Sequence, residues 1–360
     1  MLKSNGGVFG RNPTFQNVTV DGNLTVDGGI ISTGTAAAPT SNTVMGSGAG
    51  AALQAGGTNN VLLGSSAGAA ITTGDDVVAI GFDAAKLNTA NGTVAIGSGA
   101  LDANTTGTTN TAVGRNALGS NVTNVDGTAV GWAALALSTG DGNTAVGTRA
   151  LDACTTGLVN TAIGRDALGA MTTGNSAVGI GASAGANLTT SISSVAIGTS
   201  ALSTASANGS STVAIGFQAF GPATTATGSV AIGSNSGRYR GASPGTDAVT
   251  VATESVFIGS NARAAGDSQT NQIVIAGNNG LGNGSNTTTI GTSNTTGTYL
   301  AGTATSILSV AGDTVRIVND KTPANAGAAG TEGDICWDAN YIYVCVAANT
   351  WKRVAIATWP

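Results

Sequence analysis

The side chains of this sequence that could do chemistry are mainly carboxylates, because its 360 residues include no histidine. Ser-His-Asp and Cys-His catalytic arrangements and histidine-ligated zinc sites are therefore excluded. Hydrolysis of a glycosidic bond needs two carboxyl groups several ångströms apart, one acting as the acid and the other as base or nucleophile. The aspartates that could form such a pair are Asp75, Asp76, Asp83, Asp102, Asp126, Asp152 and Asp166.

Asp102 and Asp152 follow the alanine of a repeated motif at the same distance, two residues on. A residue that recurs in register is more simply explained as a solvated turn residue than as a catalyst. The acids are also too sparse to supply the six to eight oxygens of a calcium site. Glycine-rich matches such as Gly179-Ile180-Gly181 arise from the repeat and open no helix that would bind phosphate. We therefore predict that the protein is not an enzyme and uses no metal or cofactor.

Thirteen times along the chain a short extended stretch runs into a glycine that is followed three residues later by a small residue, and the typical unit reads [Thr/Val]-Ala-[Val/Ile]-Gly-x-x-Ala. Its glycines are Gly46, Gly64, Gly81, Gly97, Gly114, Gly131, Gly147, Gly164, Gly181, Gly198, Gly216 and Gly233, with Gly259 after an insertion. The eleven intervals from Gly46 to Gly233 average 17.0 residues. Such a period is shorter than that of helical repeats and matches one turn of a β-solenoid. We predict an all-β fold, a parallel β-solenoid or β-roll fibre.

Small residues dominate each repeat because the coil is narrow. Alanine stands three residues after twelve of the thirteen glycines, and Ser236 is the exception. Leucines recur one position after that alanine, at Leu101, Leu118, Leu135, Leu151, Leu168 and Leu202. Their regularity indicates a contact between chains or between layers. A single narrow coil has little core, so we expect three chains to bury the Val, Ile and Leu ladders together.

Composition excludes several classes of partner. Only 9% of residues are charged, against about 25% in ordinary globular proteins, and the net charge is −5. An acidic chain without a basic cluster predicts no nucleic-acid partner. No apolar segment is long enough to span a membrane, and Met1–Gly7 lacks the apolar core of a secretion signal, so we expect no membrane insertion. Cys154, Cys336 and Cys345 form no disulfide framework, and we expect buried thiols.

The two ends of the chain differ from the repeats. We divide the chain into an N-terminal segment (1–40), a repeat shaft (41–300), a neck (301–330) and a C-terminal β-module (331–360). The N-terminal segment carries Phe9, Arg11, Pro13 and Phe15, and it is too small to have a core, so we expect it to dock onto another protein. In the shaft an insertion carries Arg238, Tyr239 and Arg240, and insertions in solenoids form surface loops.

The last thirty residues contain five of the fourteen aromatic residues of the chain. Alternation and turn residues predict three strands, Gly333 to Trp337, Tyr341 to Ala347, and Trp351 to Thr358. Alternation also divides the rings between two faces. We expect one face, with Ile342, Val344 and Val354, to form the trimer core of this module. The candidate receptor-binding residues are Tyr341, Trp351, Tyr343 and Trp337, with Arg238, Tyr239 and Arg240 of the shaft loop as the alternative site.

The single aromatic residues of the shaft have a different interpretation. Phe82, Trp132 and Phe217 each follow a repeat glycine directly. They could be exposed platforms for sugars, but burial against a neighbouring subunit fits the narrow coil better.

The Ala-[Val/Ile]-Gly-x-x-Ala units resemble the head repeats of trimeric autotransporter adhesins, which implies a parallel β-roll of three chains. The segment Phe9-Gly10-Arg11-Asn12-Pro13-Thr14-Phe15, the NVTVDGNLTVDG run and the aromatic ending look like parts of tail fibres from marine and cyanobacterial phages. The phage resemblance implies a homotrimer in the virion, assembled in the host cytoplasm. Its N-terminus would bind a tail, baseplate or adaptor protein, and its C-terminus a host cell-surface glycan. The alternatives are a trimeric bacterial surface adhesin and a polysaccharide-depolymerising tailspike.

Overall fold

A computed structural model describes residues 42–204, 210–241, 248–249, 251–277, 279–292, 323–330 and 332–356. The chain divides into two compact units, Met1–Thr298 and Tyr299–Pro360. Phe9, Arg11, Pro13 and Phe15 lie outside the described residues. The described parts are all-β, and they form no helix long and apolar enough to cross a membrane.

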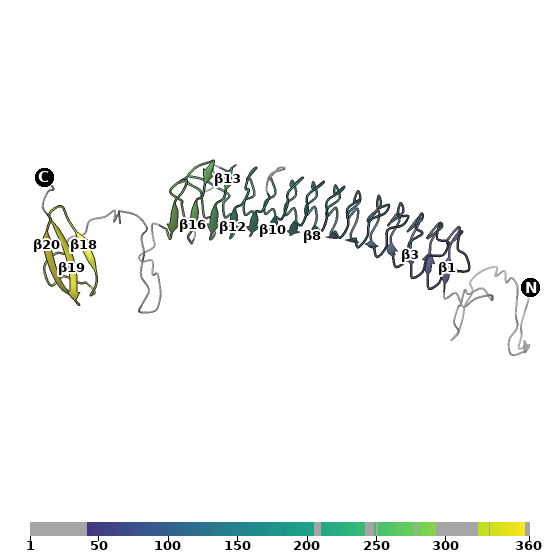
Figure 1. Cartoon of the computed structure of the whole chain (residues 1–360), viewed down its shortest axis with the longest axis horizontal. Coiled ribbons are helices and arrows are strands. Elements are labelled where there is room, and N and C mark those ends of the chain that lie inside the picture. The colour runs from purple at the N-terminus through teal and green to yellow at the C-terminus, as the bar shows by residue number, and fades with distance from the viewer. Residues whose placement is uncertain are drawn as a thin grey trace, which may run out of the picture. The chain divides into compact units, whose positions relative to one another are not determined.

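The first unit contains a parallel sheet of 15 short strands, and each strand belongs to one coil of a solenoid (Figure 1). The predicted fold class is confirmed. The strands pair in chain order and in register, so that Thr144 lies opposite Thr161 and Val146 opposite Ile163. The strands are β1 (Thr43–Met45), β2 (Val61–Leu63), β3 (Val78–Ile80), β4 (Val94–Ile96), β5 (Thr111–Val113), β6 (Thr128–Val130), β7 (Thr144–Val146), β8 (Thr161–Ile163), β9 (Val178–Ile180), β10 (Val195–Ile197), β11 (Val213–Ile215), β12 (Val230–Ile232), β14 (Val256–Ile258), β16 (Ile273–Ile275) and β17 (Thr288–Ile290).

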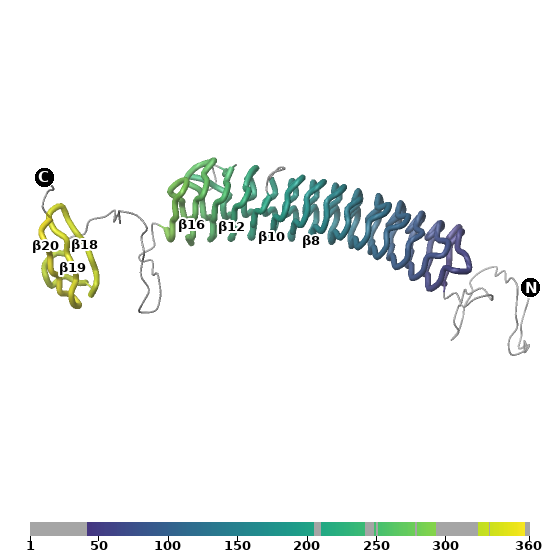
Figure 2. The backbone as a smooth tube through the Cα atoms, viewed as in Figure 1, coloured from purple at the N-terminus to yellow at the C-terminus, as the bar shows by residue number. Residues whose placement is uncertain are grey.

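The insertion adds a second small sheet to this unit. It consists of β13 (Ala252–Thr253) and β15 (Gln269–Thr270), which pair in parallel. The rest of the unit is a row of similar coils that Figure 2 shows as a gently curved stack. We call the coils from β1 to β17 the shaft. At about 4.8 Å between neighbouring strands, 15 strands extend roughly 67 Å.

The middle residue of each strand points into the coil. It is alanine in most strands, and Ala79, Ala145 and Ala231 are fully buried. The first and third residues therefore point outward, because side chains alternate along a strand. Among the third residues Met45, Val130, Val146, Ile163, Ile232, Ile275 and Ile290 are 36–58% exposed. In the single chain, then, the Val and Ile ladder lies on the outside of the coil.

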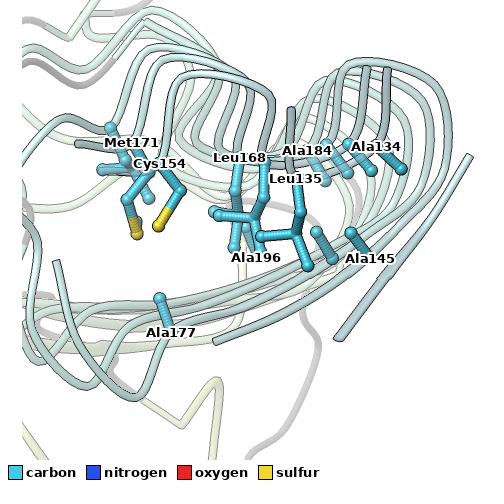
Figure 3. Close-up of a cluster of buried hydrophobic side chains, with 14 of the residues drawn as sticks. Ala134, Leu135, Ala145, Cys154, Leu168, Met171, Ala177, Ala184 and Ala196 are labelled. Atoms are coloured by element: carbon cyan, nitrogen blue, oxygen red, sulfur yellow. The ribbon is translucent and has the colours of Figure 1, made fainter. Parts of the chain in front are cut away.

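The recurring leucines fill the interior opposite the strands. Leu101, Leu118, Leu135, Leu151, Leu168 and Leu202 are at most 1% exposed, so of the two expected contacts, between chains or between layers, burial within one chain supports the second. Figure 3 shows Leu135 and Leu168 pointing from the turn wall toward the strand wall that carries Ala145 and Ala196. All six leucines have φ of 49–51°, in the left-handed region. This backbone turn directs the side chain inward, where burial stabilises by about 1.5–3 kcal/mol per leucine.

The repeat glycines allow neighbouring coils to approach closely. Gly147 has φ +136°, and a Cβ there would lie 2.6 Å from the carbonyl carbon and oxygen of Gly164 in the next coil. The same contact links successive glycines, for example Gly97 with Gly114. A side chain would therefore be strained by the backbone angle and would collide with the adjacent coil.

Buried asparagines connect the coils where the chain enters the strand. Asn160 Nδ2 donates to the carbonyl oxygen of Gly174 over 2.7 Å, and its Oδ1 accepts from the amide of Ala177 over 2.9 Å. The amide of Asn160 itself donates to Asn143 Oδ1 over 2.9 Å. These bonds satisfy backbone groups that have no partner in the sheet, which matters because a buried unpaired polar group costs about 1–3 kcal/mol.

Candidate functional site

The second unit contains an antiparallel sheet of three strands, β18 (Ile335–Trp337), β19 (Tyr341–Ala347) and β20 (Thr350–Ala355). The three predicted strands are confirmed over the described residues. The register places Cys336 and Arg353 on either side of Tyr343, and Trp351 opposite Cys345. We call the side of the sheet with Cys336, Tyr341, Tyr343, Cys345, Trp351 and Arg353 the ring face. The opposite side, with Ile335, Trp337, Ile342, Val344 and Val354, is the aliphatic face.

The aliphatic face is exposed in the single chain. Ile342 is 38%, Val344 36% and Val354 61% exposed, so these residues form no core within one chain, and their burial in a trimer core stays a prediction. On the ring face Cys336, Tyr343 and Cys345 are buried, and none of the three cysteines of the protein forms a disulfide. Alternation correctly separated the two sets of side chains, but it could not tell which face the rest of the chain covers.

A hydrogen-bond network orders the rings. Asp338 Oδ1 accepts from the amides of Asn340 and Tyr341 at 2.8 Å, which closes the turn between β18 and β19. The phenol of Tyr343 donates to Asp338 Oδ2 over 2.6 Å. This bond to a carboxylate raises the pKa of Tyr343 above its ordinary value of 10.0, while the neighbouring Arg353 opposes the rise. The guanidinium carbon of Arg353 lies 4.2 Å from the centre of the Tyr341 ring.

Residues 323–330, assigned to the neck from the sequence, pack against β20. The amide of Trp351 donates to the carbonyl of Ala326 over 2.9 Å, and its indole Nε1 donates to that of Ala328 over 3.0 Å. Gly330 exchanges hydrogen bonds with Asn349, at 2.9 and 3.0 Å. Between this segment and the sheet is a cavity of about 510 Å³, lined by Pro323, Ala324, Asn325, Ala326, Tyr343, Trp351, Lys352 and Arg353.

The structure thus brings three of the four candidate rings, Tyr341, Tyr343 and Trp351, to one face, and two of them line the cavity. Trp337 lies on the other face, because it pairs with Ile342. Sequence reasoning missed Lys352 and Arg353 as lining residues. Because side chains alternate along a strand, Arg353 lies on the same face as Trp351 and opposite Tyr343. That alternation could have identified Arg353 from the sequence. No pattern in the sequence indicated that residues 323–326 would form the other wall.

The alternative binding loop in the shaft is held by the shaft itself. Arg238 Nη1 donates to Gln218 Oε1 and, over 2.9 Å, to Asn235 Oδ1, and its guanidinium lies 4.7 Å from the Tyr239 ring. Arg240 pairs with Asp267 at 3.2 Å. The hollow beside Arg238 measures only about 150 Å³, and residues 242–247 of the loop lie outside the described residues.

Most of the candidate aspartates of the shaft form ion pairs or accept hydrogen bonds from neighbouring residues. Asp166 pairs with Arg149 of the preceding coil at 2.5 Å and with Arg165 at 2.6 Å. Asp83 pairs with Lys86 at 3.3 Å. Asp75 accepts bonds from the amide and hydroxyl of Thr58, and Asp126 accepts one from Thr109, while Asp76 adopts a left-handed φ of 58° in a turn.

Asp102 and Asp152 are not simply solvated turn residues. Burial raises the pKa of each above the ordinary 3.8, because a desolvated carboxylate is less stable than the neutral acid. At Asp152 the charge of Arg149 opposes this rise, and the charge of Asp166 adds to it. The stacking of these two coils therefore brings the partly buried side chain of Asp152 close to Asp166, whose carboxylate is paired with Arg149 and Arg165.

The aromatic residues of the shaft are exposed in the single chain. Phe82 is 59%, Trp132 45% and Phe217 51% exposed, and the guanidinium of Arg115 lies 5.9 Å from the centre of a Trp132 ring. Their expected burial against a neighbouring subunit stays a prediction.

No known family model matches this chain. Over short segments it is similar to two phage proteins. Depolymerase 1, capsule K30/K69-specific, of Klebsiella phage K5-2 is 54% identical over 37 residues, which are 10% of this chain and 5% of that protein. Depolymerase, capsule K30/K69-specific, of Klebsiella phage K64-1 is 48% identical over 42 residues, 12% of this chain and 6% of that protein. The chain thus spans a small part of either relative.

These similarities relate short segments of this β-solenoid chain to two phage proteins. They also overturn one prediction. The sequence led us to expect a protein that is not an enzyme, but both relatives are named as depolymerases, which are enzymes. The argument from repeating aspartates failed because a residue in register is not thereby solvated, as Asp152 shows.

Proposed function

We propose that this protein is a homotrimeric phage tail fibre or tailspike that binds the capsular polysaccharide of its host. The observation that carries the proposal is the outer stripe of the shaft, which we define as the first and third residues of its 15 strands. None of the residues in these strands is charged. The stripe measures roughly 67 by 10 Å, which approaches the 800 Å² or so that each partner buries in a stable interface.

A copy of the same chain is the occupant that suits this stripe. Aliphatic side chains repeat along it at the spacing of the coils, and only a partner with the same period can match them over the whole length. Exposed apolar patches of this size are uncommon in monomeric proteins. Three chains side by side would cover the stripe, as the resemblance to trimeric fibres implies. The N-terminal residues around Phe9 and Phe15 would bind the tail, baseplate or an adaptor protein.

Ile163→Glu tests the assembly. Ile163 is 41% exposed in the stripe, and glutamates from three chains would meet in an apolar contact. We expect wild type to have three times the mass of one chain in native mass spectrometry and I163E to be monomeric. Leu137→Glu is the control, because Leu137 is 50% exposed outside the strands. A monomeric wild type, or a trimeric I163E, would contradict this part of the proposal.

A second candidate is that the protein also cleaves the polysaccharide, as the names of its relatives suggest. Asp152 would act as the acid, since its pKa is raised, and Asp166 as the second carboxylate, held by Arg149 and Arg165. Incubation of the intact protein with K30 and K69 capsular polysaccharide should release reducing ends. D152N and D166N should lower the rate at least 100-fold or so, and D126N, from another coil, should not. Equal activity of all the variants would exclude this pair.

A further inference from the structure

We propose that the cavity between residues 323–326 and the ring face binds an acidic sugar residue, with its carboxylate at Arg353 and its ring near Trp351. This inference rests on the proposed function and deepens it, because it gives the chemical class of the sugar and the place where it binds. The volume of about 510 Å³ lies within the range of about 300–1,000 Å³ typical of small-ligand sites.

The walls of the cavity are fixed before any ligand arrives. The two hydrogen bonds from Trp351 to Ala326 and Ala328 hold the indole and the segment together. The Gly330–Asn349 pair fixes the end of the segment, and Asn325 Oδ1 accepts from the amide of Gly327 over 2.9 Å within its turn. A preorganised site loses little conformational entropy on binding, so that weak sugar contacts suffice.

The charge of the lining selects the ligand. Lys352 and Arg353 are the two charged residues that line the cavity, and both are exposed and basic. Arg353 lies on the ring face, whereas Lys352 pairs with Val344 and its side chain lies on the aliphatic face, so Arg353 is the cation that the cavity presents. Within the described parts of the chain neither forms an ion pair. The Tyr341 ring supports the guanidinium of Arg353 from one side, and the N–H groups of its planar fork that do not face Tyr343 can donate to a carboxylate. Asp338, the acid nearest to the rings, already accepts bonds from Tyr343 and two backbone amides.

The rest of the lining suits a sugar better than a nucleotide or a peptide. Pro323, Ala324 and Ala326 provide apolar surface, while Asn325 and Tyr343 provide polar groups, and a sugar ring presents both kinds of surface at once. Two basic residues are too few to follow a nucleic-acid backbone, and the net charge of −5 repels one. We therefore commit to a saccharide carrying a carboxylate.

The test measures binding of the full-length protein to capsular polysaccharide that contains uronic acid, and to the same polysaccharide after chemical reduction of its carboxyl groups. Titration calorimetry should show at least a tenfold or so weaker binding of the reduced form. R353Q should lose a similar factor on the native polymer, and R353K should retain part of the affinity. R115Q removes the same charge from the shaft and should bind as wild type does. Added salt should weaken wild type more than R353Q.

Two outcomes would overturn the inference while leaving the proposed function intact. One is binding to capsulated host cells together with equal affinity for the native and reduced polymers. The other is unchanged binding by R353Q with a native near-ultraviolet spectrum. Preference for a DNA oligonucleotide over the polysaccharide would also overturn it. If wild type binds capsulated cells no better than cells stripped of capsule, the proposed function itself fails, and the inference fails with it.

Discussion

The strands of the shaft and those of the C-terminal module contribute side chains of very different size to the covered side of their sheets. In the shaft the strands contribute alanine, so the coil is thin and successive glycines lie in backbone contact. In the module the covered face carries Tyr343 and Trp351, and these rings line a cavity together with residues of the neighbouring segment, to which Trp351 is hydrogen-bonded. Small residues thus produce length, and large ones produce a place where a ligand can bind.

The two regions share one property, an aliphatic face that the single chain leaves exposed. In the shaft it is the outer stripe, and in the module it includes Ile342 and Val354. Their hydrogen bonding differs. Parallel coils are joined by backbone bonds and by buried asparagines such as Asn160, whereas the module adds hydrogen bonds from its rings to the backbone pairing of its antiparallel strands. Substitutions should therefore act through backbone fit in the shaft and through side-chain contacts in the module.

The largest effect is expected from Gly147→Ala in the shaft. A non-glycine residue at a strained positive φ costs about 1–3 kcal/mol, and the overlap with the Gly164 carbonyl adds roughly 1–3 kcal/mol more. Gly92→Ala is the control, because a Cβ at Gly92 meets nothing within 4 Å, and its φ of +62° costs only about 1–2 kcal/mol. Denaturant unfolding followed by far-ultraviolet circular dichroism measures both. Equal losses would show that the close approach of the coils is unimportant.

An intermediate effect is expected from Trp351→Phe in the module. The variant loses the indole bond to Ala328 and some buried area, at a cost of about 1–2 kcal/mol. Trp337→Phe on the aliphatic face serves as the control. Near-ultraviolet circular dichroism during thermal unfolding should show a lower melting temperature for W351F than for W337F, with the far-ultraviolet transition of the shaft unchanged. A shift of the shaft transition in W351F would mean that the two units do not unfold separately.

The smallest effect, with the opposite sign, is expected from Asp102→Asn. Burial raises the pKa of Asp102 in the folded state above 3.8, so the folded protein binds the proton more tightly than the unfolded chain. Ionisation therefore destabilises the fold as pH rises from about 3.8 through the folded pKa. D102N should melt at a higher temperature than wild type at pH 7, and the difference should vanish below pH 3.8 or so. If D102N still melts at a higher temperature than wild type at pH 3, ionisation of Asp102 is not the cause of the difference.

Sequence reasoning reached the architecture because both units repeat simple patterns. The mean interval of 17.0 residues between the repeat glycines predicted the coils of the solenoid, and the turn residues at Asp338 predicted the hairpin of the module. The side of each strand that faces the interior was harder to predict. Alternation shows that Ala145 and Val146 face opposite ways, but it does not say which of the two faces inward. The inward leucines depend on a left-handed φ that leucine seldom adopts, so residue type gave no warning of it.

The amino-acid sequence by itself determined the period of the shaft, the three strands of the module and the absence of histidine chemistry, because these follow from local residue types. Tertiary structure alone decided what is buried and what is brought together. Asp152 lies near Asp166 because one turn of the solenoid stacks residues from successive repeats, and burial then raises its pKa. The cavity exists because residues 323–326 fold back over β20, more than twenty residues further along the chain. Contacts of that kind depend on the path of the backbone, which short-range patterns do not encode.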